Sequence, residues 1–143
     1  MDNQATYDDV NLILKLYELR RDDRLREARK WFAGLKVKTL AELQAAAPPG
    51  SEQDASLRMV TSYWEMAASF ITSGVLNQDL FLQSGGELVF IWTKIQDVVP
   101  EVRKAFNNPK YLSNVETIAN AMIANMNRAN PKAYEAFVAR VKG

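Results

Sequence analysis

The sequence contains neither cysteine nor histidine among its 143 residues. The absence of cysteine excludes disulfide bonds, thiolate nucleophiles and zinc sites built on thiolates. The absence of histidine excludes Ser-His-Asp triads, histidine general bases and metal centres that need imidazole ligands. Any reaction would therefore have to use carboxylate, lysine, tyrosine or hydroxyl side chains, and we expect neither a cofactor nor a metal ion.

The chain also lacks an excess of charge of one sign and a long apolar run. Its 18 Lys and Arg side chains against 17 Asp and Glu side chains give a formal net charge of +1. Such a balance produces no overall field that would attract a polyanion, so we expect no nucleic-acid partner. No apolar stretch approaches the roughly 20 residues that cross a bilayer, and the residues from Met1 to Ala5 are too polar for a signal peptide. We therefore expect no membrane span and a cytoplasmic location.

What the chain does have is a hydrophobic content of 48%, with apolar residues recurring at steps of three and four. This period is typical of amphipathic helices. We predict an all-α fold, a compact bundle of about five main helices with short connecting helices, forming one domain over residues 1–143. The expected helical segments run from near Tyr7 without a break to Gly34, from Thr39 to about Ala46, from Ser51 to Gly74, from Gln78 to Gln83, from Ser84 to Asn107 with a kink or restart at Pro100, from Ser113 onward, and from Asn130 to the end.

Capping patterns support several of these helix starts. A Ser or Thr followed three residues later by Glu is typical of a capping box. The pairs are Thr39 with Glu42, Ser84 with Glu87, and Ser113 with Glu116. The glycines between Ser84 and Glu87 are accordingly interpreted as part of a capping turn rather than of a phosphate-binding loop, since no strand precedes them.

The first expected helix carries the candidate interaction residues. Its middle is densely charged and its far end is apolar, and together they would present a surface to another protein or to a second copy of the chain. The candidate residues are Arg24, Arg29, Trp31 and Phe32. Acidic residues such as Asp22 and Glu27 alternate with the basic ones, which favours a solvated face over a phosphate site.

A second group of residues could line a pocket between helices. The candidate pocket residues are Trp64, Glu65, Trp92 and Arg103. Glu65 is flanked by Trp64 and Met66, and apolar surroundings can suit a carboxylate to acid–base chemistry. The alternative is a structural ion pair of Glu65 with Arg103 or Arg58, which is the more common role for such a carboxylate. Aromatic side chains at helical spacing are likewise more often core than pocket.

Several short segments together resemble a bacterial family of unknown function. They are Leu16–Arg20, Ala28–Phe32, Ser62–Glu65 leading into Ser73–Leu76, and the later Trp92 and Arg103. The resemblance covers roughly Tyr7 to Ala121 and implies a helical fold, but it carries no catalytic residues. Many members of the similar family have a membrane helix upstream of this region, and the present sequence shows no such helix.

Two hypotheses about function follow from these observations. The first is a non-enzymatic protein-interaction module, with a protein partner or a homo-oligomer. The alternative is a small-molecule-binding or enzymatic helical bundle with a pocket near Trp64, Glu65 and Trp92. We favour the first, because the lack of histidine and cysteine removes the commonest catalytic groups.

Overall fold

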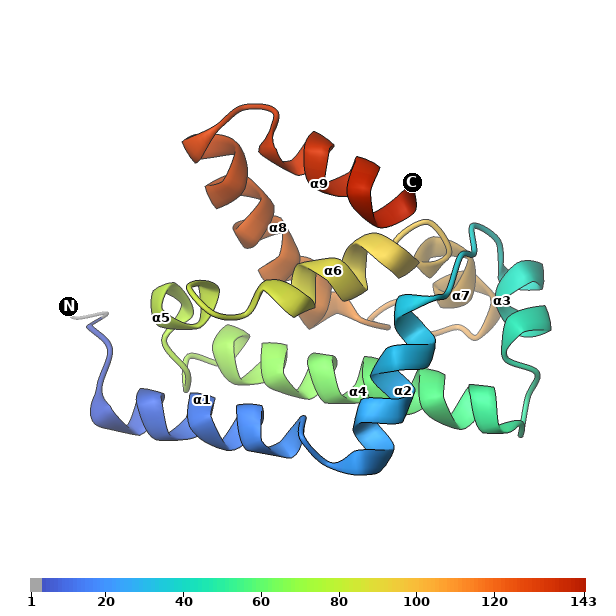
Figure 1. Cartoon of the computed structure of the whole chain (residues 1–143), viewed down its shortest axis with the longest axis horizontal. Helices are drawn as coiled ribbons and strands as arrows, with labels where there is room; N and C mark the ends of the chain where they lie inside the picture. Colours follow the sequence, from blue (N-terminus) through green and yellow to red (C-terminus); the bar gives the residue numbers. More distant parts are fainter. Residues whose placement is uncertain (1–3) are drawn as a thin grey trace.

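The computed structural model describes residues 4–143, which contain nine α-helices and no strand (Figure 1). The helices are α1 (Tyr7–Leu19), α2 (Asp23–Ala33), α3 (Leu40–Ala46), α4 (Glu52–Thr72), α5 (Gln78–Leu82), α6 (Gly86–Ile95), α7 (Val99–Ala105), α8 (Ser113–Ala129) and α9 (Ala133–Lys142). The all-α prediction is confirmed. Residues 1–3, part of the segment compared above with a signal peptide, lie outside the described residues.

The expected unbroken first helix was wrong, because the chain turns between α1 and α2. α1 ends at Leu19, and the side chain of Asp22 caps α2 by accepting a hydrogen bond of 3.1 Å from the backbone N–H of Leu25. An Asp at this position satisfies one of the free N–H groups of a new helix. The run of five charges from Arg20 to Arg24 therefore spans the turn between the two helices and the first two residues of α2. Residues 4–143 contain six helices of ten or more residues, where about five main helices were expected.

Local signals predicted some helix ends correctly. Ser51, Thr39 and Asn77 cap α4, α3 and α5 as expected, each through a side-chain oxygen that accepts a backbone N–H. Gly74, with a φ of +88°, follows the end of α4 in a left-handed conformation that suits glycine. Pro100 lies in the first turn of α7, where the missing N–H costs no helical bond, so the predicted restart is confirmed.

Other caps were predicted wrongly. α6 starts at Gly86 without a side-chain cap, and Ser113 already belongs to the first turn of α8 instead of preceding it. α9 begins at Ala133 rather than directly at Pro131. In the first two cases the Glu of the expected capping box, Glu87 or Glu116, bonds to an arginine elsewhere in the fold.

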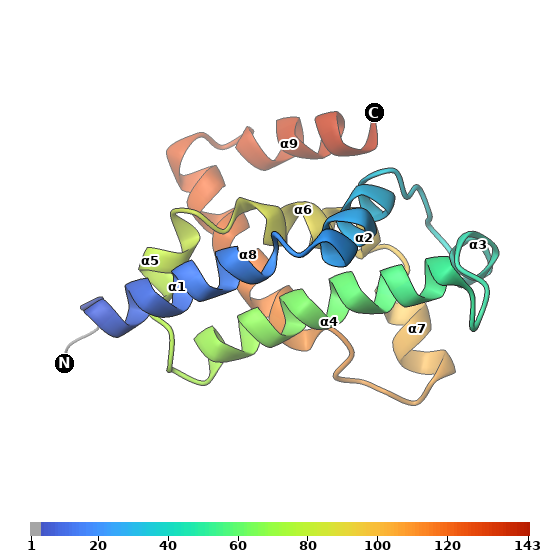
Figure 2. The same cartoon turned by 60° about the horizontal axis from the view of Figure 1, so that its bottom comes forward.

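The long helix α4 lies at the centre of the packing. α2 packs on its first half and α8 packs on its second half, while α6 packs against α8 and α9 covers α6 and α8 on the far side (Figures 1 and 2). Trp64 of α4 is 1% exposed and belongs to one continuous cluster of buried apolar side chains. α1 lies at the edge of the molecule in both views, beside α5 and the second half of α4.

Candidate functional site

The outward side of α1 carries four exposed apolar side chains in a row. Tyr7, Val10, Leu14 and Tyr17 are 79%, 40%, 59% and 56% exposed. Their spacing of three, four and three residues places them on one narrow face of the helix. We call this face the outer stripe. Apolar side chains that gather in this way on the surface of a folded domain are typical of a contact surface.

The opposite side of α1 is fixed to the bundle, so the outer stripe must point away from it. Leu16 is buried, and its carbonyl accepts a hydrogen bond from the hydroxyl of Tyr63 on α4. The carboxylate of Asp9 accepts backbone N–H groups of Thr6 at 2.7 Å and of Asn77 at 2.9 Å. These hydrogen bonds, that from Thr6 first, hold the pKa of Asp9 below its usual value. α1 is thus apolar on two sides and buries one of them.

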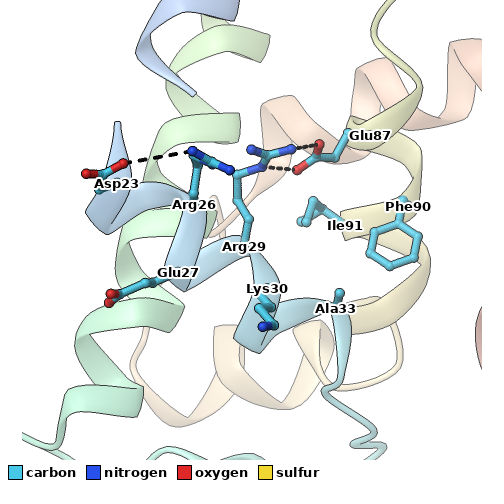
Figure 3. Close-up of a pocket in the computed structure, with 9 residues that line it drawn as sticks. All are labelled: Asp23, Arg26, Glu27, Arg29, Lys30, Ala33, Glu87, Phe90 and Ile91. Carbon is cyan, nitrogen blue, oxygen red and sulfur yellow. Dashed lines mark hydrogen bonds and ion pairs between the residues drawn. The ribbon is translucent and has the colours of Figure 1, made fainter. Parts of the chain in front are cut away.

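Arg20, Arg29 and Glu87 form a charged corner beneath the turn between α1 and α2. Nε and Nη2 of Arg29 donate to the two carboxylate oxygens of Glu87 at 2.7 and 2.6 Å, and the two hydrogen bonds form a bidentate pair (Figure 3). Nη1 of Arg29 donates to the carbonyl of Arg20 at 3.2 Å. The hydrogen bond to Glu87 raises the pKa of Arg29 above its usual value. Because bidentate pairs are directional, the charged corner fixes the turn against α6.

The guanidinium of Arg20 extends the charged corner to the aromatic side chains. It lies 4.9 Å from the ring centroid of Tyr17 and 5.4 Å from that of Trp64, distances at which a cation is attracted to a ring face. Arg20 therefore contacts the end of the outer stripe on one side and the core on the other.

The candidate interaction residues do not come together on one exposed surface. Phe32 is fully buried in the core, and Arg29 is used by the charged corner. Nη2 of Arg24 donates to Glu52 at 2.8 Å and to Ser56 at 3.1 Å, so it joins α2 to α4. Trp31 is half-buried and lines a shallow groove between α2 and α3. The sequence analysis did not predict that the outer stripe would be exposed. Its helical spacing, four residues from Val10 to Leu14 and three from Leu14 to Tyr17, is nevertheless evident in the sequence.

A groove between α2 and α6 contains charges of both signs. Figure 3 shows Phe90 and Ile91 of α6 facing the charged side chains of α2 across it. The lining cations Arg26, Arg29 and Lys30 are matched by three carboxylates, those of Asp23, Glu27 and Glu87. This balance favours neither an anion nor a cation as a ligand.

The candidate pocket residues are also separated. Trp64 and Trp92 are buried in the core, whereas Glu65 lines a surface depression to which neither tryptophan contributes. Arg103 pairs with Glu116 at 2.8 Å and donates to the carbonyl of Tyr111 at 2.9 Å rather than to Glu65. The four residues therefore do not share one cavity.

Glu65 instead caps the N-terminus of α8 from a neighbouring helix. Its carboxylate accepts the backbone N–H groups of Asn114 at 3.2 Å and of Val115 at 3.0 Å, and the side-chain amide of Asn114 at 2.8 Å. A negative charge at this position is favourable, because the free N–H groups and the helix dipole are positive there. This role explains why α8 needs no cap from Leu112, the residue before it.

Within residues 4–143, no group of three or more Asp or Glu side chains could hold a metal ion. Within the same range, every helix is too short or too polar to cross a membrane.

The fold and the site define an all-α domain whose first helix lies at the edge with an exposed apolar stripe. The chain belongs to the family described as "Domain of unknown function (DUF4760)", whose model matches residues 5–122. The resemblance to an uncharacterised family is thereby confirmed. The matched residues include α1 to α7 and the first part of α8, so α9 lies outside them. Comparison with curated proteins and with solved structures gave no match.

Replacing Glu65 tests the cap of α8. We expect Glu65→Ala to lower the free energy of unfolding by about 1–3 kcal/mol, because two backbone donors lose a charged acceptor. Glu65→Gln keeps an acceptor oxygen and should cause a smaller loss. Chemical denaturation measures both, with Glu135→Ala on the exposed side of α9 as the control. Equal losses for Glu65→Ala and Glu135→Ala would contradict the capping role.

The buried hydroxyl of Tyr63 predicts a dependence of stability on alkaline pH. Burial is the main cause that raises the pKa of Tyr63 from 10.0 to about 12. Between these values the unfolded chain releases a proton that the folded chain keeps, so the free energy of unfolding falls as the pH rises. The expected loss across the window is about 2–3 kcal/mol.

The comparison with Tyr63→Phe isolates this effect, because the variant has no hydroxyl to titrate. Denaturation curves recorded at several pH values from 10 to 12 should show a shallower decline for Tyr63→Phe than for the natural chain. Burial also raises the pKa of Tyr111, so the difference between the two proteins is the informative quantity. Identical declines would refute the assignment to Tyr63.

Proposed function

We propose that the domain is a non-enzymatic protein-interaction module that self-associates through the outer stripe of α1. The observation that carries the proposal is the exposure of four apolar side chains on a helix whose other side is already fixed to the bundle. Exposed tyrosines at such a surface supply large contact areas together with a hydroxyl that can stay hydrated.

The spacing of the outer stripe suits pairing with its own copy. Tyr7 and Leu14 are seven residues apart, as are Val10 and Tyr17. Apolar residues recur at this seven-residue spacing where two helices pack side by side along a seam. The spacing of three, four and three residues is the same whether α1 is followed from its first residue or from its last. In an antiparallel pair related by a two-fold axis, Tyr7 therefore meets Tyr17 of the second copy, and Val10 meets Leu14.

The helix dipole favours the antiparallel arrangement over the parallel one, because the dipoles of two antiparallel helices oppose each other favourably. Charged side chains do not decide between the two arrangements. The first turn of α1 carries Asp8 and Asp9, and the other end of the helix carries both signs, with Glu18 in the last turn and Arg20, Arg21, Asp22 and Asp23 after it.

The area available supports a weak, concentration-dependent dimer. The exposed parts of the four side chains amount to on the order of 500 Å² per copy, and a pair would bury on the order of 1000 Å², near the lower bound for specific interfaces. We therefore expect a dimer that dissociates on dilution.

Replacing Leu14 tests the interface. The natural chain should change from the 16.2 kDa mass of one copy at low concentration toward twice that mass at high concentration. Leu14→Lys should weaken self-association at least about tenfold, because it puts a charged group at the centre of the seam in both copies. Sedimentation velocity and native mass spectrometry measure the populations.

The matched control is Leu19→Lys, which makes the same chemical change on the same helix. Leu19 is 43% exposed but lies on the other side of α1 from the outer stripe. This variant should dimerise like the natural chain, and circular dichroism checks that both variants stay folded. A natural chain that remains monomeric at every concentration, or variants that dimerise equally, would overturn the proposal.

A further inference from the structure

Four lysines line a cavity of about 340 Å³ where the segment between α2 and α3, the start of α3, the end of α6 and the end of α9 meet. The lysines are Lys36, Lys38, Lys94 and Lys142. Leu35, Val37 and Val141 supply apolar walls, and Glu42 and Asp97 supply the carboxylates of the lining. We call this the lysine cavity. Its volume lies in the range of small-molecule sites in proteins.

Lys94 is the buried member of the group. It is 7% exposed, and its ammonium donates one hydrogen bond of 2.8 Å to the carbonyl of Leu35, just after the end of α2. An ammonium group has three N–H donors, and within residues 4–143 the Leu35 carbonyl is the only hydrogen-bond acceptor that Lys94 has. A buried charged group with donors to spare is stabilised by a further acceptor, above all by an anion.

The carboxylates of the lysine cavity do not neutralise this charge. Asp97 accepts from Nζ of Lys142 at 2.9 Å, and Glu42 accepts from the backbone N–H of Lys38 at 2.7 Å. Neither carboxylate forms an ion pair with Lys94 or Lys36. Lys36 donates a long hydrogen bond of 3.5 Å to the backbone oxygen of Gly143, and Nζ of Lys94 lies 5.8 Å from the ring centroid of Phe90. Burial lowers the pKa of Lys94, and the positive charge of Lys36 lowers it further. An anion between these two lysines would offset both effects.

We propose that the lysine cavity binds a phosphate-type dianion, either inorganic phosphate or the phosphate group of a small phosphomonoester. Four lysines against two carboxylates leave a surplus of two positive charges, which matches a dianion. Lys94 supplies donors at the wall, and Lys36 and Lys38 supply ammonium groups at exposed positions of the lining. The apolar walls leave room for the organic part of a monoester. This site is separate from the outer stripe, so it stands whether or not the chain self-associates.

The test is a titration of the full chain followed by backbone amide NMR at a low protein concentration. The probes are inorganic phosphate and glycerol phosphate, each compared with sodium chloride at matched ionic strength. We expect saturable shifts centred on Leu35, Lys36, Val37 and Lys94. Lys36→Met should weaken binding at least about tenfold, because a charged hydrogen bond is lost. Its exposed position leaves the core unchanged.

Lys132→Met is the matched control, since it removes the same charge from an exposed position at the opposite end of α9. It should bind like the natural chain. Tighter binding of glycerol phosphate than of phosphate would identify a monoester, and the reverse would identify free phosphate; both support the proposal. Shifts that do not saturate, that chloride reproduces, or that weaken equally in Lys36→Met and Lys132→Met would overturn it.

Discussion

The wide apolar surface of α4 is the constraint that places the other helices. Residues such as Val60, Trp64, Ala67 and Ala68 are almost completely buried, so α4 needs cover on more than one side. α2 and α8 provide that cover on its two halves. α1 is then left with a place at the edge, where one of its two apolar sides can be buried and the other cannot. The exposure of the outer stripe is therefore a consequence of how α4 is packed, and burying that stripe requires a surface from outside the chain.

Polar side chains join the helices at three places where a helix begins or ends. Arg29 connects the turn before α2 to Glu87 in the first turn of α6, and Glu65 of α4 completes the start of α8. Lys94 of α6 bonds to the carbonyl of Leu35 after α2. In each case a charged group lies at the helix end whose partial charge it complements, or satisfies a backbone group that has no partner within its own helix. These contacts fix the order of the elements, while the apolar core supplies most of the stabilisation.

Signals that depend only on neighbouring residues were predicted well from the sequence. The caps at Ser51 and Asn77 and the stop near Gly74 belong to this class. The break at Asp22 was missed because the apolar period continues across it, and a period alone does not reveal a change of direction. The capping boxes expected at Ser84 and Ser113 do not form, because their glutamates bond to arginines in other helices. Glu87 bonds to Arg29, and Glu116 bonds to Arg103. The outer stripe was missed for a related reason, since helical spacing predicts that a face is apolar but not whether another helix covers it.

The two surfaces for which we propose partners lie near opposite ends of α2. Arg29, in the second half of α2, donates to the carbonyl of Arg20 in the turn after α1, and Lys94 donates to the carbonyl of Leu35 just beyond the end of α2. α2 itself has eleven residues and is roughly 16 Å long. In both views the outer stripe's helix and the ends of α6 and α9 occupy different sides of the molecule (Figures 1 and 2). A second copy seated on α1 would therefore leave the mouth of the lysine cavity open.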